Sequence, residues 1–366
     1  MSGRTRVAVS MGDPTGVGPE VTLAALLERG LARELTAILV GDRAVYESEA
    51  ARLRLRARFV DWEPPAPLPR DALAVRALAR LSPRDRRPGR PSLSGGRAAH
   101  AAIVEAVRLI RDGHADALAT APICKANLIA AGLPVGGHTE LLAALCGDVP
   151  VRMMMVGDPL RVVLVTTHLA LRDVPSALTQ SLVRDTLVLT DRALRAQFGL
   201  AHPRLGVAGL NPHAGEQGVF GDEEPRLIAP AVRAARRRGI DARGPFAADS
   251  LFPAALAGRF DALVCMYHDQ GLAPFKLLHF ADGVNVTIGL PFVRTSPDHG
   301  TAHDIAGRKR ANPDSMAAAL RLAAKLAGAG VSAAVPRGGR RRAPGLPLAS
   351  PARSQPARRL GRLGGR

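Results

Sequence analysis

The chain has 366 residues, of which 47% are hydrophobic, and a formal net charge of +18 at pH 7. This length is sufficient for a large buried core and favours two domains over one. No uninterrupted run of 18 apolar residues is present, which argues against a membrane span, and the N-terminus lacks the apolar core of a signal peptide. The composition therefore predicts a cytoplasmic globular protein.

The positive charge is concentrated near the C-terminus. Residues 331–366 contain nine arginines and no acidic residue, so they supply half of the excess. Only 3% of the residues are aromatic, which argues against a platform for stacked bases and hence against a nucleic-acid partner. We expect this Arg-, Pro- and Gly-rich segment to be a disordered tail, with a polyanion-binding arm as the alternative.

The three cysteines are Cys124, Cys146 and Cys265. They are odd in number and widely spaced, and no CxxC pair is present. The spacing therefore indicates neither a disulfide framework nor a zinc ribbon, and it favours buried thiols.

Short apolar runs alternate with amphipathic stretches along the chain, as in βαβ units with a mostly parallel sheet. In the first third, the pattern predicts a strand at 6–10, a helix from 18 to 27, strands at 35–40 and 57–60, an irregular connection over 61–96, a helix at 97–111 and a strand at 115–120. Further on, it predicts strands at 152–156 and 161–167, a helix at 178–198 and a last helix at 317–326. The tight-turn residues Gly157, Asp158 and Pro159 predict that the 152–156 and 161–167 strands form an antiparallel hairpin.

Three strand-like runs each end on a histidine, namely His168, His213 and His268. Parallel α/β sheets place their ligands at the points where strands end and loops begin. Three imidazoles at one sheet edge are able to hold a divalent metal with positions left open for a substrate. The pattern therefore indicates a metalloenzyme, although each histidine taken alone fits an ordinary polar residue at a strand end.

Polar groups are dense after the third histidine. Lys276 is one of only four lysines beside 46 arginines, which suggests a role in proton exchange that arginine cannot fill. A solvated surface lysine is the alternative. Asn285 lies in the next strand-like run, and Arg294 follows a Pro-containing turn suited to a bidentate grip on phosphate or carboxylate.

The segment Gly136 to Glu140 (GGHTE) opens a helical run. Backbone N–H groups at a helix start, with His138 and the Thr139 hydroxyl, make a ready anion site. An ordinary N-cap by Thr139 is the alternative.

Taken together and in order, the motifs of this chain resemble those of the 4-hydroxythreonine-4-phosphate dehydrogenase family of pyridoxal phosphate biosynthesis. They are MGDPTGVGPE (11–20), GGHTE (136–140), NPHAGEQG (211–218), GPFAADSLF (244–252), YHDQGLAPFK (267–276) and GLPFVRTSPDHGTAHDIAG (289–307). The resemblance extends from about residue 6 to residue 330.

The resemblance implies a role for each candidate residue. Its metal ligands are His168, His213 and His268, which would hold one divalent ion per subunit, either zinc, magnesium, cobalt or manganese. The implied substrate contacts are His138, Thr139, Lys276, Asn285 and Arg294. Asp249 matches a carboxylate that lies near the family's active site. Lys276 and Asp249 are the candidate proton carriers. Members of the family are homodimers with the site near the subunit interface.

The segment from Asp298 to Gly307 is similar to the adenosine loop of the isocitrate and isopropylmalate dehydrogenase superfamily. This likeness implies two α/β/α lobes with mostly parallel sheets and a cleft between them, within residues 1–330, the middle lobe covering about 140–285. The implied cofactor contacts are His299, Gly300, Asp304 and Asn312. An aspartate at position 304 would accept hydrogen bonds from the adenosine ribose and would repel a 2′-phosphate. NAD is therefore expected over NADP.

The implied reaction is NAD(P)-dependent oxidation of 4-phosphooxy-L-threonine at C3, followed by decarboxylation to 3-amino-2-oxopropyl phosphate. Two alternatives remain open at the level of the sequence. A paralogue would oxidise another phosphorylated hydroxy acid, such as threonate or erythronate 4-phosphate, or a cyclic diol dicarboxylate. A basic nucleic-acid-binding protein acting through its tail is the alternative from another class.

Overall fold

The structure is a computed structural model that describes residues 4–78, 80–133 and 137–329. The described residues belong to one compact unit. The tail at 331–366, for which disorder was expected, lies outside them. No helix in the described ranges is long and apolar enough to cross a membrane.

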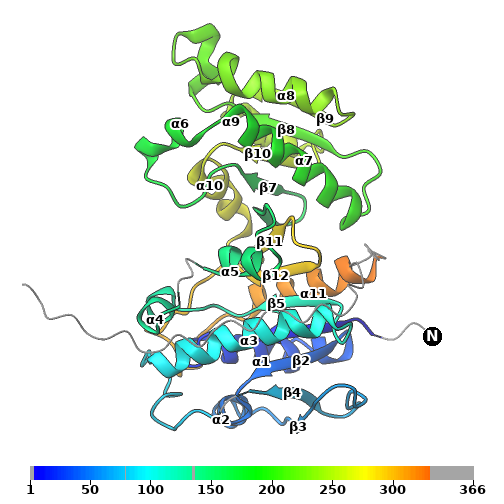
Figure 1. Cartoon of the computed structure of the whole chain (residues 1–366), viewed down its shortest axis with the longest axis vertical. Coiled ribbons are helices and arrows are strands. Elements are labelled where there is room, and N and C mark those ends of the chain that lie inside the picture. Colours follow the sequence, from blue (N-terminus) through cyan, green and yellow to red (C-terminus); the bar gives the residue numbers. More distant parts are fainter. Residues whose placement is uncertain (1–3, 79, 134–136, 330–366) are drawn as a thin grey trace, which may run out of the picture. The chain divides into compact units, whose positions relative to one another are not determined.

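Twelve strands in the described ranges form one sheet, in the order β3-β4-β2-β1-β5-β12-β11-β6-β7-β10-β8-β9 (Figure 1). The strands are β1 (Arg6–Ser10), β2 (Thr36–Gly41), β3 (Phe59–Asp61), β4 (Leu73–Ala77), β5 (Ala117–Thr120), β6 (Arg152–Val156), β7 (Arg161–Leu164), β8 (Arg204–Ala208), β9 (Asp241–Phe246), β10 (Ala262–Cys265), β11 (Val284–Ile288) and β12 (Val293–Pro297). The α-helices are α1 (Gly18–Leu27), α2 (Arg43–Leu53), α3 (Leu93–Arg111), α4 (Lys125–Ala130), α5 (His138–Leu145), α6 (Val174–Ala177), α7 (Gln180–Ala196), α8 (Ala229–Arg236), α9 (Ala248–Leu256), α10 (His268–His279) and α11 (Asp314–Gly328).

Most strand pairs are parallel, which confirms the predicted α/β class. The antiparallel pairs are β12 with β11, β11 with β6, and β6 with β7. The last of these is the predicted hairpin, in which Val156 pairs with Arg161. The strands that precede the three histidines, β7, β10 and β8, are adjacent and parallel, as the sequence pattern indicated.

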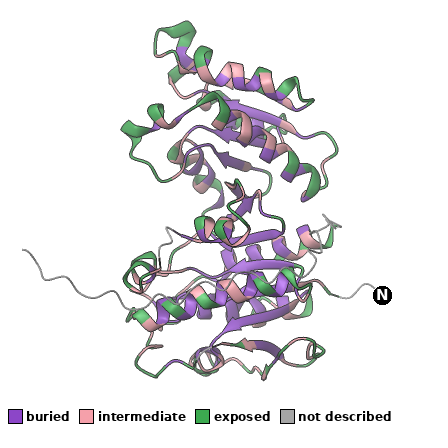
Figure 2. Cartoon of the chain, in the orientation of Figure 1, coloured by how far each residue is buried: buried purple, intermediate pink, exposed green. Residues whose placement is uncertain are grey.

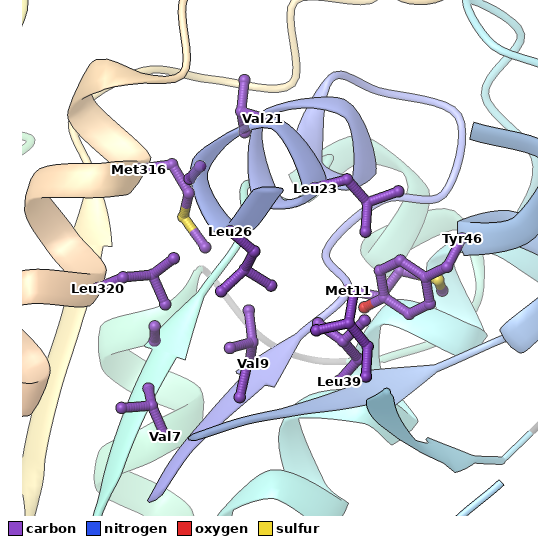
Figure 3. Close-up of a cluster of buried hydrophobic side chains, with 14 of the residues drawn as sticks. Val7, Val9, Met11, Val21, Leu23, Leu26, Leu39, Tyr46, Met316 and Leu320 are labelled. Atoms are coloured by element: carbon purple, nitrogen blue, oxygen red, sulfur yellow. The ribbon is translucent and has the colours of Figure 1, made fainter. Parts of the chain in front are cut away.

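Alternation along each strand sends side chains to the two faces of the sheet. In β1, Val7 and Val9 enter one hydrophobic cluster, whereas Ala8 enters another on the opposite face. Figure 3 shows Val7 and Val9 facing Leu26 of α1 and Leu320 of α11. These side chains are fully buried, and each contributes about 1.5–3 kcal/mol to folding by leaving water.

The buried residues form four clusters, two on each half of the sheet. On one face, α3 and α5 cover the half that contains β1 and β5, while α9 and α10 cover the half that contains β7 and β10. Figure 2 shows the strands as a buried band between more exposed helices. On this face the two clusters are separate, and polar side chains lie on the strands between them.

Two expectations need correction. The connection over 61–96 is not irregular throughout, because it contains β4 and the start of α3. β4 is short and follows a Pro-rich stretch, so its parallel pairing with β2 and β3, rather than its composition, makes it a strand. Of the three thiols only Cys265 is buried, and Cys124 and Cys146 are partly exposed. The two-lobe division stays a prediction.

The turn after β1 requires a glycine. Gly12 has φ of +71°, and a Cβ there would lie 2.4 Å from the carbonyl oxygen of Pro122. Asp13, the next residue, donates its backbone N–H to that same carbonyl at 2.8 Å. Gly12 therefore lets the first turn approach the loop that leads into α4.

We expect Gly12→Ala to lower the free energy of unfolding by about 3 kcal/mol, because the new Cβ collides with backbone. Gly30→Ala is the matched control, since Gly30 also has positive φ but a Cβ there would meet nothing within 4 Å. That change should cost only about 1 kcal/mol, the cost of the left-handed conformation. Denaturant unfolding of both variants checks this, and equal losses would contradict the role given to the Pro122 contact.

Candidate active site

A cavity of about 350 Å³ lies over the strands between the two hydrophobic clusters that α3 and α5, and α9 and α10, form on one face of the sheet. Alternation in β5, β12 and β11 brings Thr120, Arg294 and Asn285 to its wall, and α10 contributes Lys276. The cavity has the size of a small-molecule site. Its lining is rich in cationic groups, so it is suited to an anionic ligand.

Arg294 is the most unusual residue of this cavity. It is 2% exposed, and its guanidinium donates to the hydroxyls of Thr287 and Thr120 at 2.9 and 2.6 Å. Both partners are neutral, and the Nε atom has no partner within the described residues. Burial lowers the pKa of Arg294 to about 9, which leaves it cationic at neutral pH. A buried cation with neutral partners is matched best by an anion in the cavity.

His138 is the first residue of α5 and lies in the same part of the cavity. Burial, followed by the charges of Arg294 and Lys125, holds the pKa of His138 well below its ordinary value. The ring is therefore neutral, and its Nε2 atom has no partner among the described residues. A neutral imidazole can donate one hydrogen bond to a ligand without adding charge. Thr139 follows it and also lines the cavity.

Lys276 lies on α10 and forms an ion pair with Asp298, with 3.1 Å between Nζ and Oδ2. Burial raises the pKa of Asp298, and the opposing effect of Lys276 is smaller. The carboxylate is therefore a better proton acceptor than an exposed aspartate would be. This pair places a proton donor and a proton acceptor side by side at the cavity wall.

His168 and His268 come together, with 5.6 Å between their ring centroids. The Nδ1 atom of His268 lies 2.7 Å from Asp269 Oδ1, which leaves Nε2 available for a ligand. Burial, with the charges of Lys125 and His268, lowers the pKa of His168, so this ring is neutral. Neutral imidazoles are the form that binds metal ions.

His213 does not join this pair. It lies in the 3₁₀ segment Pro212–Gly218, where the five residues from His213 to Gln217 all have positive φ. Glu224 holds the start of that segment by accepting the N–H groups of Leu210 and Asn211, both at 2.7 Å. His213 instead packs against Phe220, with 6.0 Å between the rings. In the described ranges, no group of three His, Cys, Asp or Glu residues could hold a metal ion.

Asp249 also lies away from the cavity. It is exposed in the first turn of α9, and its carboxylate accepts the N–H of Ser250 at 2.8 Å. Of the predicted cofactor contacts, His299 and Gly300 line the cavity. Asp304 is exposed, and Asn312 accepts the N–H of Asp314 at the start of α11.

The predicted cofactor segment is attached to the first turn of the chain. Val17 donates its N–H to the Thr301 carbonyl at 2.9 Å, and the buried Glu20 accepts the N–H of Ala311 at 3.2 Å. His303 lies 3.5 Å from the carboxylate of Asp13. The motif at 11–20 therefore supports the 298–312 segment rather than contacting the cavity itself.

Several cavity residues were missed from the sequence, namely Thr120, Lys125, Glu140, Ser296 and Asp298. Lys125 could have been found, because the scarcity of lysine that drew attention to Lys276 applies equally to it. Glu140, Ser296 and Asp298 lie within the quoted motifs at 136–140 and 289–307, whereas Thr120 carries no such mark. Their placement depends on which strands are neighbours.

The comparisons with known proteins agree with this geometry. Residues 33–323 match the family model described as pyridoxal phosphate biosynthetic protein PdxA. The chain belongs to the PdxA family. It is 50% identical over 329 residues to a 4-hydroxythreonine-4-phosphate dehydrogenase of Geobacter metallireducens, covering 88% of this chain and 96% of the relative.

Two solved structures are similar to this PdxA family member. The 4-hydroxythreonine-4-phosphate dehydrogenase of Klebsiella pneumoniae has a TM-score of 0.81 and 39% identity, covering 89% of this chain and all of that one. A terephthalate 1,2-cis-dihydrodiol dehydrogenase of Burkholderia xenovorans has a TM-score of 0.62 and 31% identity, covering 88% and 98%. The resemblance inferred from the motifs is therefore confirmed at the level of the family.

We expect Arg294→Met to raise the free energy of unfolding by about 1 kcal/mol, because it removes a buried cation that has only neutral partners. The same variant should be stabilised less than the wild type by added inorganic phosphate, since folded-state binding is lost. Thermal unfolding with and without phosphate measures both effects.

Arg161→Met is the control, because Arg161 is also partly buried but lies outside the cavity, where its guanidinium donates to the Asp261 carbonyl at 3.1 Å. Its stabilisation by phosphate should equal that of the wild type. A full phosphate effect in Arg294→Met would show that Arg294 does not hold the anion.

Proposed function

We propose that this chain is a 4-hydroxythreonine-4-phosphate dehydrogenase of pyridoxal phosphate biosynthesis. The observation that carries the proposal is membership of the PdxA family over nearly the whole described chain, together with the cationic cavity. The substrate is 4-phosphooxy-L-threonine, which is oxidised at C3 and then loses CO₂ to give 3-amino-2-oxopropyl phosphate. The cofactor is NAD or NADP.

The residues of the cavity suit such a substrate. An anionic group of the substrate is held by Arg294, His138 and Thr139. The Nε atom of Arg294 and the Nε2 atom of His138 are buried without a hydrogen-bond partner among the described residues, so both are free to donate to it. Asn285 and Lys125 flank this position and complete the polar wall. Holding the anion in this cavity fixes C3 of the substrate relative to the other groups.

Oxidation breaks the C3–H bond and the hydroxyl O–H bond. A nicotinamide cofactor, which His299 and Gly300 would contact, would supply the acceptor for the hydride. The Lys276–Asp298 pair takes up the hydroxyl proton, because the pKa of Asp298 is raised and the two groups are 3.1 Å apart. The resulting β-keto acid loses its carboxylate as CO₂, and protonation of the remaining carbon by the same pair completes the reaction.

A divalent metal ion is part of the proposal. His168 and His268 fit it as ligands, because the lowered pKa of His168 keeps that ring neutral and Asp269 orients His268. Such an ion would supply a Lewis acid that lowers the pKa of the substrate hydroxyl. Two imidazoles are fewer than a catalytic site of this type contains, so a further ligand is needed.

We propose that a second copy of the chain supplies it. His213 and Asp249 both lie outside the cavity, in neighbouring elements, and both are exposed. Near the end of α10, Leu277 is 85% exposed and Phe280 is 83% exposed, an arrangement typical of a face that is covered in a dimer. His213 and Asp249 of one subunit would then complete the cavity of the other.

The assay that tests the function is the reduction of NAD⁺ and NADP⁺ by the purified chain with a panel of substrates. We expect turnover of 4-phosphooxy-L-threonine, with a higher kcat/KM for NAD⁺ because the exposed Asp304 carboxylate repels a 2′-phosphate. Lys276→Met should lower kcat by about 100-fold or more, as expected for loss of a proton carrier. Threonate and erythronate 4-phosphates and a cyclic diol dicarboxylate form the comparison set, and exclusive turnover of one of them would replace the proposed substrate.

The shared site predicts a complementation result. His213→Ala and His268→Ala should each be inactive alone, whereas subunits mixed by unfolding and refolding should regain about one quarter of wild-type activity. Random pairing makes half of the dimers mixed, and each mixed dimer has one intact site when the two histidines come from different chains. Mixing His168→Ala with His268→Ala is the control, because both residues belong to one chain's cavity and no activity should return. Failure of the first mixture would place all three histidines in one subunit.

A further inference from the structure

A second cavity lies at the opposite edge of the sheet and takes no part in the proposed reaction. Its volume is about 680 Å³, and it lies at the amino ends of β1, β2 and β4. These strands are parallel to one another and to β5, whose last residue, Thr120, lines the candidate active site at the carboxyl edge. The two cavities therefore lie near opposite ends of these parallel strands.

The charge of this second cavity is strongly unbalanced. Five arginines line it, Arg4, Arg6, Arg56, Arg58 and Arg70, against the single acidic residue Asp71. Arg6 is neutralised by Asp116, and Arg4 donates to the Ala32 carbonyl at 3.3 Å. The remaining three arginines form no ion pair with any residue that the structure describes.

The floor of the cavity is apolar. Leu35, Ala37, Leu73 and Ala74 are at most 8% exposed, and Leu27 and Leu68 line the cavity beside them. Guanidinium groups that line one cavity repel one another, and a dianion relieves this repulsion while accepting charge-assisted hydrogen bonds from them. An apolar floor adds affinity for a ligand that also carries a hydrocarbon or ring portion.

We infer that this cavity is a second ligand site, specific for a small organic phosphomonoester with an apolar body. The volume lies in the range of about 300–1,000 Å³ that small-molecule sites occupy. No aromatic side chain of the described residues lines the cavity, so it offers no surface on which the bases of a nucleic acid could stack. Bound ligand would contact the starts of three parallel strands and the connection between β3 and β4.

The chain contains its own reporter for this site. Trp62 is the only tryptophan of the sequence, and it lies at the start of the β3–β4 connection. Its indole N–H donates to the Ala66 carbonyl at 2.7 Å, and it packs in one cluster with Leu68 and Ala74, which line the cavity. Tryptophan fluorescence is therefore expected to change when a ligand binds at this cavity.

The test is a fluorescence titration of the full chain with phenyl phosphate at constant ionic strength. We expect a saturable change that becomes at least about tenfold weaker when Arg56, Arg58 and Arg70 are all replaced by Gln, because charge-assisted bonds to the phosphoryl group are lost. All three side chains are exposed, so the fold should survive, and circular dichroism checks this. Inorganic phosphate lacks the apolar ring, and benzyl alcohol lacks the phosphoryl group. Both should therefore bind markedly more weakly than phenyl phosphate.

Two control variants separate this site from other effects. Replacement of Arg233, Arg237 and Arg238 by Gln removes the same charge from exposed positions in and after α8 and should leave the titration unchanged. Arg294→Met should also leave it unchanged, because that residue belongs to the other cavity. The inference is overturned by the absence of saturation, by an equal loss in either control, or by inorganic phosphate binding as tightly as phenyl phosphate.

Discussion

The candidate active site depends on one buried charge, the guanidinium of Arg294. It is held in a β-strand by two threonine hydroxyls, and no carboxylate of the described residues pairs with it. Burying a cation in this way costs stability unless an anion completes the arrangement. The neutral state of His138 follows in part from the same charge, because the cation beside a buried imidazole disfavours its protonation. The cavity is thus preorganised for an anionic group before any ligand enters.

The position of that charge follows from how the sheet is covered. On one face, α3 and α5 bury the half around β1 and β5, and α9 and α10 bury the half around β7 and β10. The strands between these halves, β12, β11 and β6, form two of the three antiparallel pairs of the sheet. Because the apolar packing of the helices is interrupted there, polar residues such as Asn285 and Ser296 can face a ligand. The candidate active site therefore lies between the two hydrophobic clusters.

The two cavities lie at opposite ends of the parallel strands of the sheet. The polar residues of the candidate active site gather near the carboxyl ends of β5 and β12, as is general for α/β proteins. The amino ends of β1, β2 and β4 carry a separate group of arginines over an apolar floor. A ligand at that edge would stabilise the same strands that position Thr120, so binding at the two edges is able to be coupled through the folded sheet.

The sequence by itself determined the class of fold, most of the secondary structure and several residues of the candidate site. Periodicity located β1 and α1 at their observed ends, because local burial patterns are set by neighbours along the chain. Motif order identified the family, and residue type selected His138, Lys276 and Arg294. Only the tertiary structure decided that His213 and Asp249 stand apart from the cavity and that Asp298 pairs with Lys276. Those facts depend on distances between residues remote in the sequence, which no local pattern contains.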